Sequence, residues 1–182
     1  MTTAATLADR LSAVGFGAPR ELTDAGAADL VAFTEQLGRP PRGLLAIAHR
    51  CRHGVPASVL TAPRLPDGTP FPTLYYLSCR ALNTAVSRME AAGVMRDMTE
   101  TLSQDSDLAE AYRRAHESYL ATRNLIDDLG IAVTAGGMPD RVKCLHVLVA
   151  HALAVGPGVN PLGDKAIELL PDYLRGEPGC VG

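Results

Sequence analysis

Cysteine and histidine are the residues of this chain whose types and spacing point most clearly to chemistry. Four cysteines are present; Cys51, Cys79 and Cys144 lie far apart and form no CxxC pair, and Cys180 is near the C-terminal end. In a reducing compartment such cysteines are thiols or metal ligands rather than disulfides. Three thiolates with one open position suit an iron–sulfur cluster, or zinc completed by histidine or water. The alternative is that each is a small buried hydrophobic residue.

Two of these cysteines end segments that have the composition of strands. GLLAIAHRC (43–51) and PTLYYLSC (72–79) are short and apolar or rich in strand formers. With PASVLTA (56–62) between them, they predict an antiparallel meander, in which the first and third strands run in the same direction. Cys51 and Cys79 are then expected at one edge of the sheet, about 10 Å apart.

A helix predicted from Pro139 to about Val155 carries the third cysteine. If this helix docks at the same sheet edge, Cys144 joins the other two thiolates, with His151 as a further ligand. Helix geometry argues against a zinc site made from this helix alone. Cys144 and His151 would be about 10 Å apart along the axis, and Cys144 and His146 about 200° apart around it. We therefore expect His146 to be a hydrogen-bonded, partly buried side chain of the pocket.

A polar stripe follows one face of the long helix predicted to begin near Ser106. Tyr112, His116, Tyr119 and Arg123 are spaced by four, three and four residues, which places them on the same face. His116 could act as a general acid or base, or as a further metal ligand. The alternative is a stripe of amphipathic side chains that pack on the sheet with their polar ends in water.

A glycine pair before the predicted helix at 139–155 suggests an anion site. Gly136 and Gly137 precede the expected helix N-terminus, and Arg141 and Lys143 lie in its first turns. Free N–H groups, the helix dipole and two cations suit a phosphate or a carboxylate. The sequence is neither a Walker loop nor a GxGxxG fingerprint. The alternative is therefore a Gly-Gly turn beside a solvated cationic face.

The remaining segments predict helices that cover the small sheet. Helical patterns bounded by caps, glycines and prolines occupy about 25–37 (with Asp24 as N-cap), 80–92, 94–102, 106–128, 139–155 and 163–174. The chain is thus predicted to be α+β, a small three-stranded antiparallel sheet covered by a majority of helices. Residues 1–20 predict a flexible N-terminal arm, 21–174 a single domain and 175–182 a disordered tail.

Composition excludes several classes of partner. The 182 residues are 47% hydrophobic and 20% charged, with a net charge of −3 and only 4% aromatic residues. This balance argues against nucleic-acid binding, which needs a basic surface and exposed rings. No apolar run approaches the length of a membrane span, and the N-terminus has no signal-peptide pattern. The expected location is the cytoplasm.

Two longer stretches resemble a known family. QLGRPPRG…HRC…PRLPDGTPFPTLYYLSC (36–79) and AGGMPDRVKCLHVLVAHAL…GVNPLGD (135–164), with AYRRAHESYLATR between them, resemble the actinobacterial branch of the domain-of-unknown-function 501 family. The resemblance spans roughly residues 24–170 and implies no established activity. The chain departs from the family pattern at Arg80, where proline is usual, and at Leu148, where some relatives carry a further histidine.

These observations lead to three hypotheses of function. The first is a cytoplasmic protein with a metal or iron–sulfur centre that acts on a small anionic substrate. Its centre would be formed by Cys51, Cys79, Cys144 and His151, with His116 as the catalytic group and Arg141 and Lys143 holding the substrate. The competing hypothesis is a metal-free binding or regulatory module that acts through protein partners. The third is a metal-independent enzyme that uses Cys144 or His116.

Overall fold

The computed structural model describes residues 2–132 and 134–173. Its elements are α1 (Ala4–Leu11), a 3-10 turn (Ser12–Val14), α2 (Ala27–Leu37), β1 (Leu44–Arg50), β2 (Pro56–Thr61), β3 (Tyr75–Leu77), α3 (Arg80–Ala91), α4 (Val94–Gln104), α5 (Ser106–Ile126), a second 3-10 turn (Ala135–Gly137), α6 (Leu145–Val155) and α7 (Pro161–Tyr173). The α+β class is confirmed. The predicted tail at 175–182, including Cys180, lies outside the described residues.

The sheet is the predicted antiparallel meander, in the order β1-β2-β3. Val59 of β2 pairs with Ile47 of β1 and with Tyr76 of β3. The third strand is shorter than the predicted 72–79. Pro72 has no N–H to donate, and the N–H of Leu74 donates to Tyr119 Oη (2.6 Å), so regular pairing begins at Tyr75.

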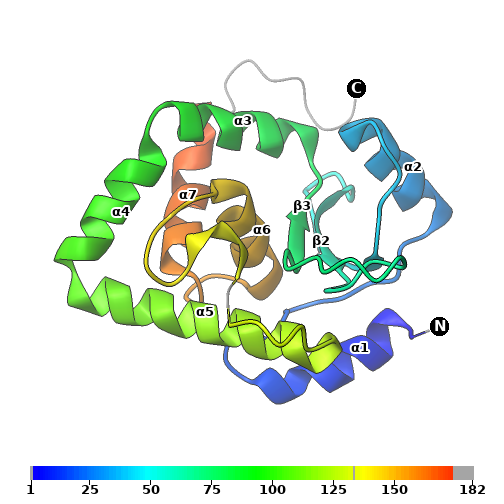
Figure 1. Cartoon of the computed structure of the whole chain (residues 1–182). Helices are drawn as coiled ribbons and strands as arrows, with labels where there is room; N and C mark the ends of the chain where they lie inside the picture. Colours follow the sequence, from blue (N-terminus) through cyan, green and yellow to red (C-terminus); the bar gives the residue numbers. More distant parts are fainter. Residues whose placement is uncertain (1, 133, 174–182) are drawn as a thin grey trace.

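Helix α6 is the centre of the molecule. Its sequence, LHVLVAHALAV, is apolar on almost every side, and nearly all of its residues are buried, as expected of a helix surrounded by protein. It packs against the sheet on one side and against α3 and α7 on others. Figure 1 shows α3, α4 and α5 running around it as a frame. Apart from its two histidines, α6 has no titratable side chain, so carboxylates and basic groups near it come from neighbouring elements.

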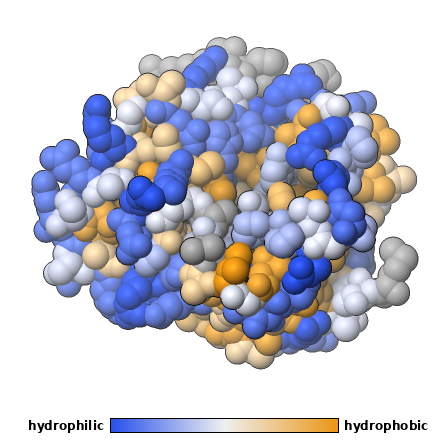
Figure 2. All heavy atoms as spheres, viewed as in Figure 1, coloured by the Kyte–Doolittle hydropathy of each residue, from blue (hydrophilic) through white to orange (hydrophobic). Residues whose placement is uncertain are grey.

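The surface is mixed in character. The face seen in Figure 2 is largely hydrophilic, with apolar residues gathered in smaller areas between the charged ones. Among the described residues, no helix is both long enough and apolar enough to cross a membrane.

Helix α6 begins at Leu145, not at Pro139 as predicted. The preceding residues instead fold back as a turn, in which Lys143 N donates to Gly136 O (2.7 Å) and Arg141 N donates to Gly137 O (3.1 Å). Both glycines have positive φ, 85° and 93°, a conformation that glycine adopts at little cost. The pair therefore closes a loop and does not open a helix.

Helix α1 lies within the region predicted to be a flexible arm. Leu7 and Leu11 are buried in the main hydrophobic core, which gives this segment an apolar face to pack. The cap prediction for Asp24 was wrong, because its Oδ1 accepts from the backbone N of Ala4 in α1 (2.8 Å). Helix α2 has Gly26 at its N-cap instead.

Candidate functional site

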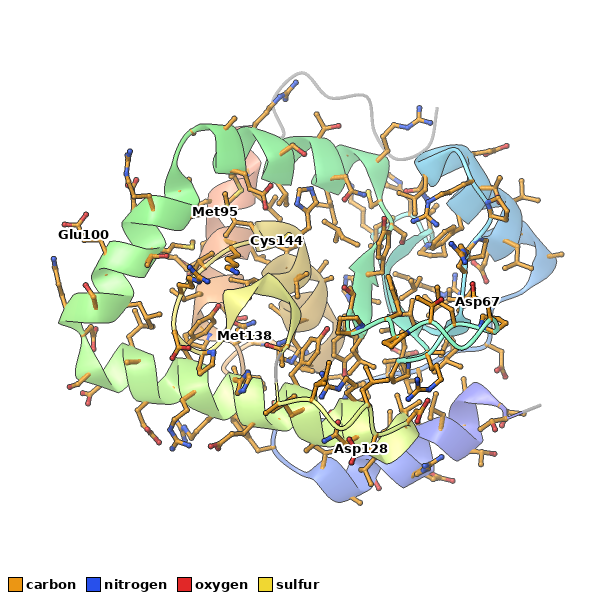
Figure 3. The ribbon with its side chains drawn as sticks, viewed as in Figure 1. Asp67, Met95, Glu100, Asp128, Met138 and Cys144 are labelled. Carbon is orange, nitrogen blue, oxygen red and sulfur yellow. The ribbon has the colours of Figure 1, made fainter. Side chains whose placement is uncertain are left out.

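Three potential metal ligands meet where the C-terminal end of α3 approaches the start of α6. Glu90 comes from α3, Cys144 is the N-cap of α6 and His146 lies in its first turn. Their ligand atoms all lie within 4.8 Å of one another, and no other such His, Cys, Asp or Glu group occurs in 2–132 and 134–173. Figure 3 shows Cys144 beneath α3, on the segment that leads into α6. We call these three residues the Glu90 group.

A hydrogen bond across the two helices fixes this group. Glu90 Oε1 accepts from the backbone N of Leu145 (2.7 Å) and lies 3.2 Å from His146 Nδ1. The first N–H groups of a helix have no partner within the helix, so Glu90 caps α6 from outside. Ser87, one turn earlier on α3, places its Oγ 3.4 Å from His146 Nε2. These contacts also stabilise the junction, whether or not an ion is bound.

The sulfur of Cys144 lies on the same side of the imidazole as the carboxylate. Cys144 Sγ is 3.9 Å from His146 Nδ1. The hydrogen bond with Cys144 raises the pKa of His146 to about 8, and the charge of Glu90 acts in the same direction, whereas partial burial opposes both. The imidazole is therefore mainly protonated at neutral pH. Glu90 and His146 remain 23% and 27% exposed, so an ion can reach them from solvent.

One thiolate, one imidazole and one carboxylate form a ligand set typical of zinc. Protein sites with three such ligands leave the fourth tetrahedral position for water or substrate. An iron–sulfur cluster needs more thiolates than this group provides. The chemistry available is thus that of a single ion of the zinc type with an open position.

The structure does not bring the three predicted cysteine ligands together. Cys51 and Cys79 pack in one small apolar cluster with Ala57, whereas Cys144 packs against the main core. Cys79 is the N-cap of α3 and Glu90 lies near the other end of that helix, a separation of about 16 Å at the helical rise. Cys144 docks at the far end of α3 and not at the sheet edge, so the expected three-thiolate centre does not form.

His151 lies in the core and not at the Glu90 group. Its ring stacks on Tyr75 (centroids 5.3 Å apart) and meets Tyr119 edge-on (5.1 Å). Nδ1 lies 3.1 Å from Asn160 Nδ2, so the amide donates to it, and Nε2 is buried without a partner among the described residues. Burial lowers the pKa of His151 to about 3. The side chain is a neutral packing residue.

The stripe on α5 faces inward, and its polar atoms contact nearby backbone and side chains. His116 Nδ1 lies 3.2 Å from Thr134 Oγ1, and Tyr112 donates to the carbonyl of Arg141 (3.4 Å). Arg123 is fully buried and donates to a carbonyl of the loop that follows α5. Burial lowers the pKa of His116. Tyr112, His116 and Arg123 therefore fasten this loop to α5, whereas Tyr119 Oη accepts from the backbone N of Leu74 (2.6 Å). None of the four belongs to the Glu90 group.

The predicted anion site has a different geometry from the one expected. The backbone N–H groups of Arg141 and Lys143 are engaged with the two glycine carbonyls, and the N–H of Leu145 is taken by Glu90. A helix N-terminus directly after Gly137 is absent. The side chains of Arg141 and Lys143 are exposed, and Lys143 immediately precedes Cys144. The predicted anion site therefore has no free backbone N–H groups at these three positions, and two exposed cationic side chains remain of it.

Glu90 is the site residue that the sequence did not reveal. Its place depends on how α3 docks against α6, which no local spacing encodes. The proximity of Cys144 to His146 could have been found from the sequence. Cys144 directly precedes the apolar run that forms α6, so it can be the N-cap of that helix and need not lie within it. In that position Cys144 has extended backbone angles (φ −154°, ψ 112°), so the 200° helical separation no longer applies.

The comparisons with known proteins add a family but no activity. The family described as "Protein of unknown function (DUF501)" matches residues 47–168, a range that runs from β1 into α7 and contains the whole Glu90 group. Comparison with curated proteins and with solved structures finds no match.

Proposed function

Because this chain belongs to the DUF501 family, whose description assigns no activity, we propose its function from the site geometry: it binds one divalent transition-metal ion of the zinc type. Glu90, Cys144 and His146 are the proposed ligands. The observation that carries the proposal is that ligand atoms from two helices lie within 4.8 Å of one another. The hydrogen bond from Leu145 N to Glu90 holds the two helices at this spacing.

The charges of the group suit a divalent ion with one open position. A thiolate, a carboxylate and a neutral imidazole together carry two negative charges, which balance the ion. A water molecule in the open position becomes more acidic and can act as a nucleophile near neutral pH. The exposed side chain of Lys143, next to Cys144 in the chain, favours a small anionic substrate at that position. The proposed role is Lewis-acid catalysis on such a substrate, in place of electron transfer by an iron–sulfur cluster.

Metal titration tests the proposal directly. We expect the full chain, purified with a chelator and then dialysed, to take up about one equivalent of Zn²⁺ or Co²⁺. A Cys144→Ser variant is expected to lose the sulfur-to-cobalt charge-transfer absorbance, and a His146→Gln variant to bind the ion more weakly. Matched controls are Cys51→Ser and His53→Gln, which alter a cysteine and a histidine outside the Glu90 group.

The outcome that contradicts the proposal is also specific. If a folded sample takes up less than about a tenth of an equivalent of metal, the proposal is wrong. Glu90 then serves only as a cap of α6 and as the ion-pair partner of His146. Equal loss of the cobalt signal in Cys144→Ser and Cys51→Ser would place the ion elsewhere. Either result would favour the metal-free binding module as the function of this fold.

A further inference from the structure

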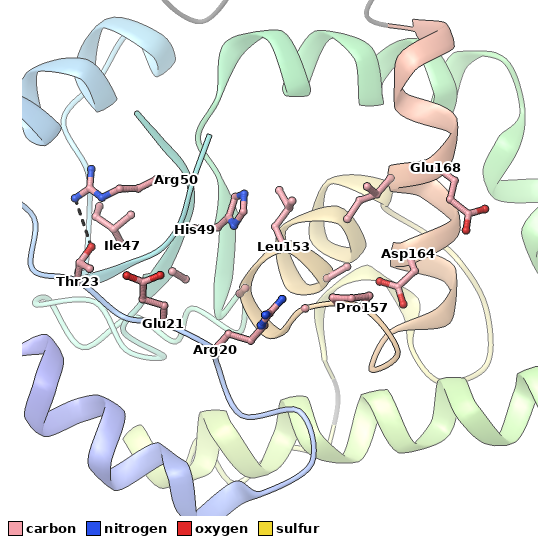
Figure 4. Close-up of a pocket in the computed structure, with 15 residues that line it drawn as sticks. Arg20, Glu21, Thr23, Ile47, His49, Arg50, Leu153, Pro157, Asp164 and Glu168 are labelled. Carbon is pink, nitrogen blue, oxygen red and sulfur yellow. Dashed lines mark hydrogen bonds between the residues drawn. The ribbon is translucent and has the colours of Figure 1, made fainter. Parts of the chain in front are cut away.

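A groove of about 710 Å³ lies at the other end of α6 from the Glu90 group. It is bounded by β1, by the segment 20–23, and by the residues that join α6 to α7 (Figure 4). Its apolar lining includes Ala48, Leu153 and Ile167. The volume is in the range of pockets that hold small organic ligands. About eight residues of helix, or roughly 12 Å, separate the groove from the proposed metal ligands.

Arg20 is positioned at this groove without a charged partner. Its backbone N donates to Ala154 O (3.0 Å), and its side chain crosses Gly156 so closely that a Cβ there would lie 2.2 Å from Arg20 Cδ. Within the described residues its guanidinium forms no ion pair. Burial lowers the pKa of His49; the charge of Glu21, which also lines the groove, opposes this effect, and the charge of Arg20 adds to it. The guanidinium thus remains available to a carboxylate.

The opposite rim of the groove is acidic. Asp164 and Glu168 lie one turn apart on α7, and Figure 4 shows them on the side away from the sheet. Burial raises the pKa of Asp164, and the charge of Glu168 acts in the same direction. The carbonyls at the C-terminal end of α6 lie on the other side, next to Arg20, where their partial negative charge favours a cation. Asp164 Oδ2 accepts from the backbone N of Gly158 (2.8 Å), and Glu168 Oε2 forms an ion pair with Lys165 Nζ (3.0 Å). A cation in the groove would add to these contacts and offset the charge of the two carboxylates.

From this distribution of charge we propose that the groove binds a zwitterionic, dipeptide-sized molecule with free ends. The carboxylate pairs with Arg20, the ammonium group lies against Asp164 and Glu168, and apolar side chains rest on Leu153 and Ile167. A polyanion would be repelled by the acidic rim, and a neutral apolar molecule would form no ion pair with either end of the groove. The proposal does not depend on the metal site.

Leucyl-leucine is a suitable probe, because it has two free ends and two apolar side chains. Its binding to the full chain can be followed by amide chemical shifts. In Arg20→Met we expect affinity to fall about tenfold, the effect of losing one charge-assisted hydrogen bond. Glu168→Gln, an exposed position, is expected to weaken binding in the same way. The matched control Arg52→Met changes an exposed arginine outside the groove and should have no effect.

Two blocked probes separate the ends of the ligand. Leucyl-leucine amide lacks the carboxylate, so its weaker binding should be insensitive to Arg20→Met. N-acetyl-leucyl-leucine lacks the ammonium group, so its binding should be insensitive to Glu168→Gln. Absence of leucyl-leucine binding at millimolar concentration would overturn the proposal. So would equal affinity of all three probes, or affinity for leucyl-leucine that neither variant changes.

Discussion

His151 should make the fold sensitive to acid. The side chain is fully buried between two tyrosine rings, and burial lowers its pKa to about 3, whereas an unfolded histidine titrates near 6.5. Below pH 6.5 the unfolded chain therefore binds more protons than the folded chain, and the free energy of unfolding falls as pH falls. The slope is about 1.4 kcal/mol per pH unit, which amounts to about 2 kcal/mol at pH 5.

Urea unfolding at pH 7, 6 and 5 measures this loss. His151→Phe keeps a ring between Tyr75 and Tyr119 but cannot take up a proton. It leaves the Asn160 amide without its acceptor, which costs about 1–3 kcal/mol at every pH. We therefore expect the variant to be less stable at pH 7 but to lose less stability on acidification than the natural chain.

The difference between the two slopes isolates His151 from other groups. Burial also lowers the pKa values of His49 and His116, so some acid sensitivity remains in the variant. His53→Gln, an exposed position, serves as the control and should leave the slope unchanged. If His151→Phe and the natural chain lost equal free energy between pH 7 and pH 5, the reasoning from burial would be refuted.

Two further results follow from particular contacts. In metal-free protein the imidazole of His146 should titrate near pH 8 by NMR, and its pKa should be lower in Cys144→Ser. Because the pKa is raised in the folded state, protonated His146 stabilises the fold fully below about pH 6.5, and this stabilisation is lost as pH rises through 8. Gly163→Ala should destabilise the fold by about 1–3 kcal/mol, because the new Cβ would lie 2.5 Å from the carbonyl oxygen of Leu148. Gly26→Ala, where the nearest such atom is 3.8 Å away, loses only the preference of an N-cap for glycine over alanine and should lower the urea midpoint less. Equal midpoints for both variants would contradict the packing argument.

Local patterns were sufficient for most of the fold. The three strands and α3 to α5 lie within a few residues of their predicted ranges, since each is bounded by proline, glycine or a capping residue and has a continuous apolar face. The antiparallel order of the sheet followed from short connections between successive strands. The meander also predicted that Cys51 and Cys79 lie near one edge of the sheet, and both residues pack in the same small apolar cluster.

The candidate site could not be predicted to the same extent, because it depends on contacts between distant segments. Glu90 reaches α6 only through the docking of α3, and its hydrogen bond to Leu145 joins residues 55 positions apart. The start of α6 was also set by tertiary contacts: Thr99 Oγ1 accepts from the backbone N of Val142 (3.1 Å). This bond and the glycine turn together hold the preceding residues out of the helix. The prediction placed Cys144 inside the helix, where it would point away from His146. In the fold Cys144 is the N-cap, and its sulfur lies near that imidazole.

The apolar character of α6 explains why both proposed sites lie at its ends. A helix buried on nearly every side cannot carry charged groups along its length, because burying an unpaired charge is strongly unfavourable. At its first turn unpaired N–H groups favour anionic ligands such as Glu90 and a Cys144 thiolate, and at its last turn the carbonyls favour a cation. The two ends therefore select opposite charges. Zinc binding at one end and leucyl-leucine at the other should raise the urea midpoint additively, and strong non-additivity would show that α6 couples them.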